Sequence, residues 1–523
     1  MILNSLKVDK LNILGYIITV LIIVQFLGGR MKKINLKKYI ILFIANAIIV
    51  FAFYLSQNIY NASFDQYIYS LIKVAGMNGA SVVSIAIIIL YGFTLFTFLN
   101  TVLILPTRDF GRKITIDIKR KGNKKEFTIL PIKNIKRYSL VILIISIGYL
   151  GTVVGFFDYV FNSFRNTDLF KNYYVNPEEV DIEFPDKKQN LIYIFMESTE
   201  MTNVSKKNGG VFDISITPNL ENIALNNINF SNTELLGGAR ESYGTSWTAA
   251  AMIAQTAGIP LKVKLDDVSS NNSTSFNNIT TLGDILSSNG YNNYLLMGSD
   301  ANFGGRRAYF SNHNYIISDY YTAVEDGKID SDYHEWWGYE DSKLFTYAKE
   351  YLIKLANDGK PFNFTMLTAD THFTDGYLDK SCSNVFSEAY ANSFYCSDSM
   401  IADFISWIQE QDFYENTTIV LTGDHPTMQD NFYNVIGDYD RTVYNAFINS
   451  RVLPVNNKNR VFTTMDMFPT TLASLGVTID GDRLGLGTNL FSSKKTIPEE
   501  IGIDTFNKEL KKNSNYYYKY IRK

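Results

Sequence analysis

Cysteine is nearly absent from this chain of 523 residues, which contains only Cys382 and Cys396. Two thiols exclude a disulfide-rich scaffold, and no partner ligands lie around them at zinc-like spacing. A disulfide between the two and a pair of free thiols are equally compatible with the sequence. Histidine is also scarce, with four residues in the chain. One of the four stands beside an aspartate in the stretch TIVLTGDHP (418–426), which raises the question of a metal site.

After residue 165, Lys and Arg are fewer than Asp and Glu. Residues 1–165 contain 20 Lys and Arg against 6 Asp and Glu, whereas the remainder contains 29 against 46. We expect no nucleic-acid partner for an acidic domain, because phosphate backbones attract Lys and Arg. A basic, apolar first part followed by an acidic, mixed part indicates a membrane region and then a soluble domain.

Charged residues are missing from four long apolar runs in the first part. Each run has about the length that crosses a hydrocarbon core of ~30 Å as a helix. A cleaved signal peptide would account for only the first of them. We therefore predict a transmembrane region over residues 1–157, with four helical spans at about 11–29, 39–56, 81–105 and 139–157.

The loops between these runs indicate the orientation of the chain. The loop at 30–38 contains five Lys and Arg and the loop at 106–138 contains eleven, whereas the loop at 57–80 contains only Lys73. By the positive-inside rule the first two loops face the cytoplasm and the third faces outward. The chain after about residue 158 is then predicted to lie outside the cytoplasm, anchored to the membrane.

The outer part shows an alternation of buried-strand and helical patterns. Residues 158–187 read as a juxtamembrane connector, 188–490 as an α/β domain and 491–523 as an aromatic, basic tail. Strands are predicted at 190–196, 293–298, 362–368 and 418–423, with a fifth at 443–450. Helices are predicted at 245–257, 279–288, 340–356, 396–411 and 464–475. This rhythm is typical of a mostly parallel sheet with helices on both faces.

Polar side chains follow three of the predicted strands directly. Glu197 follows NLIYIFM, His372 lies just beyond FNFTMLT, and Asp424 and His425 follow TIVLTG. Ligands of open α/β sheets bind beyond the carboxyl ends of the strands. Glu197, Asp424 and His425 form an oxygen-rich ligand set without thiolates, which suits Mn²⁺, Mg²⁺ or Zn²⁺.

A hydroxyl group is predicted at the start of one helix. The stretch ESYGTSWTAAAMIAQTAGIPL (241–261) places Thr245 and Ser246 before an Ala-rich helix that ends at Gly258. A helix N-terminus favours negative charge such as a phosphoryl group. Thr245 or Ser246 could instead only cap the helix, and capping and catalysis are compatible.

These motifs, in this order, resemble the sulfatase-type, alkaline-phosphatase-like superfamily. IYIFMES, GTSWT before a helix closing with GIP, and LTGDHP are similar to the lipoteichoic acid synthase and phosphoglycerol transferase branch, over most of 188–490. The resemblance implies one divalent metal, Mn²⁺ first and Mg²⁺ or Zn²⁺ next, held by Glu197, Thr245, Asp424 and His425. It also implies Thr245 as the nucleophile that becomes glycerophosphorylated by phosphatidylglycerol.

Further site residues follow from the same resemblance. His372 is expected to contact the phosphoglycerol group or carry a proton, and Arg306 and Trp247 to bind substrate. The family motif GNxxxFWNR is replaced here by GSDANFGGRR, with Gly304 at the tryptophan position. This departure favours transferases that modify envelope glycans over synthases of a long glycerolphosphate polymer, although either acceptor class stays open.

Alternative functions remain on the same core. A phosphoethanolamine transferase would use the same strand-end residues, but that group usually depends on several disulfides and a second ligand set. An inactive sulfatase-like binding or assembly module is the second alternative. A true sulfatase would need a C-x-P-x-R motif, and neither Cys382 nor Cys396 lies in one.

Overall fold

The protein divides into two compact units, which are described separately below. The computed structural model describes residues 36–58, 63–72, 82–107, 114–120, 123–129, 132–263, 276–429, 432, 437 and 439–522. The first unit comprises Met1–Asn58 and Ala80–Phe156, and the second comprises Ile59–Gly79 and Phe157–Lys523. The described residues 63–72, which lie in the sequence between two apolar helices, thus group with the predicted catalytic domain.

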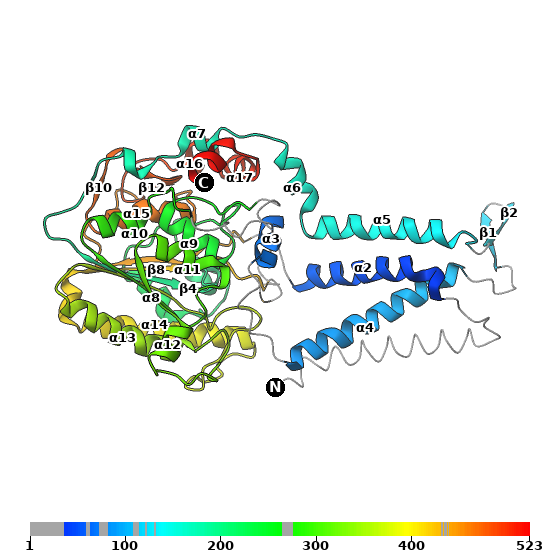
Figure 1. Ribbon diagram of the computed structural model, residues 1–523, viewed down its shortest axis with the longest axis horizontal. Helices are drawn as coiled ribbons and strands as arrows, with labels where there is room; N and C mark the ends of the chain where they lie inside the picture. The colour runs from blue at the N-terminus through cyan, green and yellow to red at the C-terminus, as the bar shows by residue number, and fades with distance from the viewer. Residues whose placement is uncertain are drawn as a thin grey trace. The chain divides into compact units, whose positions relative to one another are not determined.

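Long apolar helices make up most of the first unit. They are α2 (Ile40–Asn58), α4 (Val82–Ile104) and α5 (Ile135–Val153), and α2 packs against both others (Figure 1). The Asn46 side-chain amide donates to Phe96 O at 2.8 Å across the α2–α4 contact. Large apolar side chains such as Ile44 and Ile144 point outward, at 52 % and 69 % exposure. Outward apolar surfaces on helices of this length suit a lipid environment.

Two of the described helices are long and apolar enough to cross a membrane, Lys37–Ser56 and Ile135–Val153. They coincide with the predicted spans 39–56 and 139–157. The helix α4 covers the predicted span 81–105, and the predicted span 11–29 lies outside the described residues. The count of four spans therefore stays a prediction. The basic loop at 106–138 contains an antiparallel hairpin, β1 (Ile114–Arg120) and β2 (Asn123–Ile129).

A six-stranded sheet forms the centre of the second unit. Its strands lie in the order β6-β5-β7-β4-β8-β9, and all neighbours are parallel except β8 and β9, which are antiparallel. Their bounds are β4 (Asn190–Met196), β5 (Asn292–Met297), β6 (Tyr315–Ser318), β7 (Phe362–Leu367), β8 (Thr417–Gly423) and β9 (Asn445–Ile448). The sheet is thus mixed, and mostly parallel as predicted.

Both faces of this sheet are buried, which explains why its strands read as continuous apolar runs. Alternate residues of β4 point to opposite sides: Tyr193 joins one apolar core and Ile194 the other. The first core includes residues of α9 (Thr248–Ala257), α10 (Leu282–Ser288), α11 (Arg306–Asn312) and α15 (Met467–Ser474). The second includes residues of α8 (Pro218–Asn226), α12 (Tyr320–Glu325), α13 (Asp341–Asn357) and α14 (Ala389–Gln409). Figure 1 shows the two helical layers on either side of the strands.

The C-terminal part packs into the first of these cores. It contains α16 (Ile497–Ile501), α17 (Ile503–Lys511) and a short π-helix (Tyr517–Ile521), and Leu510 and Tyr517 are fully buried. Further α-helices and strands described in this unit are α3 (Phe64–Ile72), α6 (Phe156–Ser163), α7 (Leu169–Tyr173), β3 (Ile182–Glu183), β10 (Thr478–Ile479), β11 (Arg483–Leu484) and β12 (Gly487–Thr488). The residues predicted as a tail are therefore integral to the fold of this unit.

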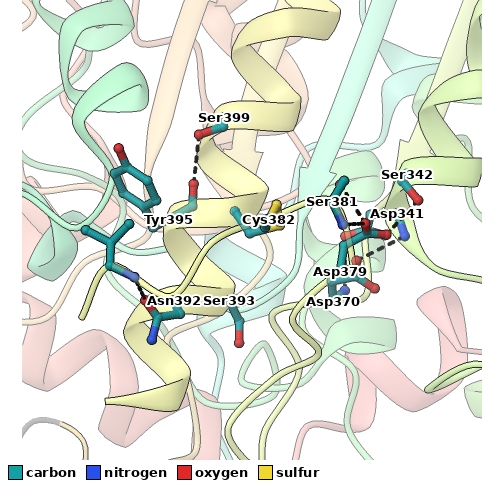
Figure 2. The surroundings of a disulfide bond; sticks show 12 residues. Asp341, Ser342, Asp370, Asp379, Ser381, Cys382, Asn392, Ser393, Tyr395 and Ser399 are labelled. Atoms are coloured by element: carbon teal, nitrogen blue, oxygen red, sulfur yellow. Dashed lines mark hydrogen bonds between the residues drawn. A yellow bond between two sulfur atoms is a disulfide. The ribbon is translucent and has the colours of Figure 1, made fainter. Parts of the chain in front are cut away.

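A disulfide joins Cys382 and Cys396, the pairing that the sequence left open (Figure 2). It ties the loop before α14 to that helix. Nearby, the Asp341 carboxylate accepts hydrogen bonds from the backbone N–H groups of Ala369 and Asp370, at 2.9 and 3.0 Å. Asp370 in turn accepts from Asp341 N at 3.1 Å. This reciprocal contact fixes the chain just beyond β7, where His372 lies.

Candidate active site

Glu197, Asp424 and His425 converge at the carboxyl end of the sheet. The strands β4 and β8 are parallel neighbours, and Met196 is paired with Gly423. Because each strand ends at that pair, the residues that follow meet at one edge. One ligand atom from each of the three side chains lies within 4.8 Å of the others, and all three residues are buried. His425 Nε2 lies 3.3 Å from Asp424 Oδ2 and 3.7 Å from Glu197 Oε1.

Hydrogen bonds orient the two carboxylates. Asp424 Oδ1 accepts from the backbone N–H groups of Ser198 and His425, both at 2.8 Å. Among the described residues, none donates a hydrogen bond to Asp424 Oδ2, although this oxygen is buried. An unpaired carboxylate oxygen in a buried site is costly. Its position beside His425 Nε2 and Glu197 suits a cation bound among them.

The His425 ring is fixed in one tautomer. Its Nδ1 lies 2.9 Å from the carbonyl oxygen of Pro426. A carbonyl oxygen only accepts, so Nδ1 carries the proton and Nε2 presents a lone pair to Asp424 and Glu197. A ring N–H held by a carbonyl is the usual outer contact of a metal-binding histidine.

The charges in this cluster also favour a cation. Burial and the charge of Glu197 raise the pKa of Asp424 to about 7. Burial lowers the pKa of His425, but Asp424 and Glu197 raise it by more, so that it lies above its ordinary value. Two carboxylates and one imidazole in a buried site match a hard or borderline divalent ion. The residues present therefore fit the metal that the sequence predicts.

Thr248, and not Thr245, supplies the hydroxyl group at this cluster. Thr248 Oγ1 lies 3.2 Å from Glu197 Oε2 and 3.5 Å from His425 Nε2. Thr245 is fully buried, and its hydroxyl donates to Ser242 O at 2.9 Å and accepts from Ser242 N at 3.0 Å. The hydroxyl of Thr245, predicted as metal ligand and nucleophile, is thus engaged within its own turn, and Thr248 is the threonine beside Glu197 and His425. The helix α9 begins at Thr248, three residues later than expected, and the preceding turn uses the hydroxyl of Thr245.

A pocket opens beside Glu197 and Thr248. Its other lining residues lie between β5 and α11, at the start of α11, at and beyond the end of β7, and in the loop between α12 and α13; they are Ser299, Asp300, Phe303, Arg306, Trp337, Leu367, Thr368, Ala369 and His372. The ring of Trp337 lies 4.6 Å from that of His372 and 5.8 Å from that of Phe303, measured between centroids. The pocket thus combines an aromatic wall with one guanidinium, one imidazole and two carboxylates, Glu197 and Asp300.

Arg306 and His372 lie in this pocket, at the site where the sequence predicts them. The Arg306 guanidinium donates to Phe303 O, Ser299 Oγ and Asp300 O at 2.9, 3.2 and 2.8 Å. His372 Nδ1 lies 2.6 Å from Phe373 O, so Nδ1 carries the proton and Nε2 can accept another. Burial lowers the pKa of His372 to about 4, and the ring is neutral at neutral pH.

Trp247, predicted to bind substrate, does not line this pocket. It is 7 % exposed, precedes α9 as its N-terminal capping residue, and packs in the apolar core. The aromatic wall comes instead from Trp337 and Phe303. Trp337 was missed because it lies in a loop far along the sequence, and no local pattern links that loop to Glu197. The sequence does contain a signal for Thr248. It is the last residue with a hydroxyl group before AAAMIA, an unbroken run of residues that favour a helix.

Known proteins are similar to this chain over most of its second unit. A model of the family described as Sulfatase matches residues 189–477. Phosphoglycerol transferase I of Escherichia coli and that of Shigella flexneri are each 30 % identical over 374 residues, covering 68 % of this chain and 46 % of the relative. The chain therefore spans about half the length of the curated relatives it matches.

The chain is also similar to solved structures. The lipoteichoic acid synthase LtaP from Listeria monocytogenes has a TM-score of 0.47 at 17 % identity, covering 61 % of this chain and 82 % of its own. The lipooligosaccharide phosphoethanolamine transferase A from Neisseria meningitidis has a TM-score of 0.48 at 12 % identity, covering 85 % of both chains. The match of the family model to more than half of the residues shows that this chain belongs to the sulfatase family.

Proposed function

We propose that this protein is a membrane-anchored phosphoglycerol transferase that moves glycerophosphate from phosphatidylglycerol to an envelope glycan or a glycerolphosphate chain. The observation that carries the proposal is the position of Thr248 Oγ1 against Glu197 and His425. A threonine hydroxyl among metal-ligand side chains, at the N-terminus of a ten-residue helix, is placed to attack a phosphoryl group. The similarity to phosphoglycerol transferases I supports the substrate class.

A single divalent cation would be held by Glu197, Asp424, His425 and the hydroxyl of Thr248. We expect Mn²⁺ first, with Mg²⁺ and Zn²⁺ as alternatives, because the set contains two carboxylates, one imidazole and no thiolate. Bound there, such an ion lowers the pKa of the threonine hydroxyl and offsets negative charge on the phosphoryl oxygens.

The neighbouring pocket suits a glycerophosphate group. Arg306 is held by two carbonyl oxygens and one hydroxyl, so its guanidinium presents a fixed positive charge to a phosphoryl oxygen. The Asp300 carboxylate and the Ser299 hydroxyl can pair with the glycerol hydroxyls. The Trp337 ring supplies an apolar wall for the glycerol carbons.

The residues of the pocket account for both halves of the transfer. In the first half, Thr248 Oγ1 passes its proton to His372 Nε2 and bonds to phosphorus. The bond from phosphorus to the diacylglycerol oxygen breaks, and that oxygen takes the proton from His372. In the second half an acceptor hydroxyl gives its proton to His372 and bonds to phosphorus. The bond from phosphorus to Thr248 Oγ1 breaks, and this oxygen takes the acceptor's proton from His372.

The apolar helices fit this substrate. A lipid with two acyl chains stays in the bilayer, and a catalytic unit attached to membrane helices remains beside it. We infer that the enzyme lies in a bacterial inner membrane with its catalytic unit on the outer side. The charge distribution of the loops supports this orientation.

Lipid assays test the proposed function. The full-length protein in nanodiscs containing phosphatidylglycerol and Mn²⁺ is expected to release diacylglycerol, and EDTA is expected to stop the release. Parallel nanodiscs with phosphatidylethanolamine test the phosphoethanolamine alternative. Release from phosphatidylethanolamine alone would overturn the headgroup assignment, and release from neither lipid would favour the inactive binding module.

A further inference from the structure

A short helix from the membrane part of the sequence packs inside the catalytic unit. This helix, α3 (Phe64–Ile72), lies in the sequence between the apolar helices α2 and α4, yet it groups with the catalytic unit. Asp65, Gln66 and Ile68 are 2 %, 7 % and 4 % exposed. Ile68 belongs to the apolar core that also contains Trp247, and the Phe64 ring lies 4.9 Å from the Tyr159 ring. A solvated connecting loop would not bury these side chains.

The central contact joins Asp65 to the chain that precedes the proposed nucleophile. The hydroxyl of Tyr243 donates a hydrogen bond to Asp65 Oδ1. Lys262 lies beside this pair, with its ammonium 5.9 Å from the centroid of the Tyr243 ring. Burial raises the pKa of Asp65, while the bond from Tyr243 and the charge of Lys262 act in the opposite direction.

The residue after Tyr243 has almost no freedom to move. Gly244 has φ of +81°, and a Cβ there would lie 2.9 Å from Pro260 Cβ and 3.0 Å from Leu261 O. Leu261 N donates to Gly244 O at 2.8 Å. The Tyr243–Gly244 peptide is thus held between α3 on one side and the segment after α9 on the other. Thr248 follows only four residues after Gly244.

A second contact links α3 to the loop that carries His425. The Gln66 amide Nε2 lies 3.6 Å from Met428 Sδ, and Met428 comes three residues after His425. The helix α3 therefore contacts both the segment that precedes Thr248 and the segment that follows His425.

We propose that Asp65 and Tyr243 are positioning residues, whose hydrogen bond fixes the turn before α9 so that Thr248 Oγ1 lies against Glu197 and His425. This inference rests on the proposed role of Thr248. The loop between two membrane helices thereby becomes part of the catalytic machinery. A displacement of about 1 Å in a reacting group can cost about 10²-fold in rate, so a modest shift of this turn has a large effect on kcat.

The experiment compares variants of the full-length protein in nanodiscs with phosphatidylglycerol and Mn²⁺. Tyr243→Phe removes one oxygen and leaves the ring. Its kcat for diacylglycerol release is expected to fall about 10- to 100-fold while KM changes less than about twofold. Asp65→Ala is expected to behave alike, and Asp65→Asn, which keeps an acceptor for Tyr243, is expected to recover much of the loss. The matched control is Tyr321→Phe, on α12 with 46 % of its surface exposed, which is expected to equal wild type.

Additivity and thermal unfolding decide between positioning and general destabilisation. The double variant Asp65→Ala/Tyr243→Phe is expected to be no slower than the slower single variant, because both remove one contact. The inference is overturned if Tyr243→Phe keeps the wild-type kcat, or if the losses in kcat of the two single variants add in the double variant. It is also overturned if the fraction of unfolded protein accounts for the whole loss in kcat. If wild type itself releases no diacylglycerol, the proposed function fails instead, and the two failures are thereby distinguished.

Discussion

Thr248 Oγ1 lies 3.2 Å from Oε2 of Glu197, although the two residues are 51 positions apart in the sequence. Glu197 is carried by the end of a central strand and Thr248 by the first turn of a helix that covers the same sheet. Both positions are determined by the backbone: β4 ends at Met196, and α9 begins at Thr248. The chemistry proposed for this protein depends on that relationship.

Substitution of the two neighbouring threonines separates their roles. Thr248→Ala is expected to lower kcat for diacylglycerol release by a factor on the order of 10³ or more, because it removes the attacking oxygen. Thr245→Ala loses two hydrogen bonds to the Ser242 backbone, which costs about 1–2 kcal/mol of stability. Its kcat is expected to stay within about tenfold of wild type. Equal loss of activity in both variants would contradict the assignment.

Replacement of Arg306 by lysine is expected to lower the activity. An ammonium cannot reproduce the fork that contacts Phe303 O, Ser299 Oγ and Asp300 O, so the charge at the pocket would become mobile. We expect Arg306→Lys to lower kcat/KM about 10²-fold. The adjacent Arg307 pairs with Asp319 and serves as the control, since Arg307→Lys keeps that ion pair and is expected to leave kcat/KM near wild type.

The pH dependence of stability is expected to reflect Asp398. Burial raises the pKa of this carboxyl to about 6, although it accepts hydrogen bonds from Leu220 N and Asn219 N at the start of α8. The folded state therefore binds a proton more tightly than the unfolded state does. The protonated Asp398 carboxyl therefore adds to the free energy of unfolding below pH 4, and this stabilisation is lost as the pH rises through about 6.

Comparison with Asp398→Asn isolates this effect, because the substitution removes the titrating group. The stability of wild type relative to the variant is expected to fall by about 1–3 kcal/mol between pH 4 and pH 7. Thermal unfolding of both proteins in detergent at several pH values measures the difference. A difference that is constant over this range, or that grows with pH, would contradict the raised pKa.

Cysteine labelling tests the orientation in the membrane. Both native cysteines are in a disulfide, so an introduced cysteine is the reactive thiol among the described residues. In intact spheroplasts, Ser331→Cys on the catalytic unit is expected to react with a membrane-impermeant maleimide. Lys38→Cys, in the loop predicted to be cytoplasmic, is expected to react only after lysis. The reverse pattern would invert the topology.

The sequence allowed the strand-end cluster to be predicted because its signal is local. A buried parallel strand reads as an apolar run, and the residue after it lies at the ligand edge, which placed Glu197, Asp424 and His425 correctly together. The start of α9 was three residues off, because Thr245, Ser246 and Thr248 are all acceptable near a helix N-terminus. Only tertiary contacts select among them.

Other features carried no local signal. The strand β6 (Tyr315–Ser318) has four residues and was not predicted, since so short a run resembles a loop. The β9 segment was expected, but its antiparallel direction depends on pairing with β8. The burial of α3 and the approach of Trp337 to His372 arise from contacts between distant segments, which periodicity in one segment does not report.

The most direct test of the central claim is the site of the covalent adduct. After brief incubation with phosphatidylglycerol and Mn²⁺ and quenching in acid, trypsin cleaves after Arg240 and Lys262 and releases one peptide with both candidate threonines. Fragmentation by electron transfer is expected to locate a glycerophosphoryl group on Thr248. A glycerophosphoryl group on Thr245 or Ser246, or no adduct in a protein that releases diacylglycerol, would contradict the account.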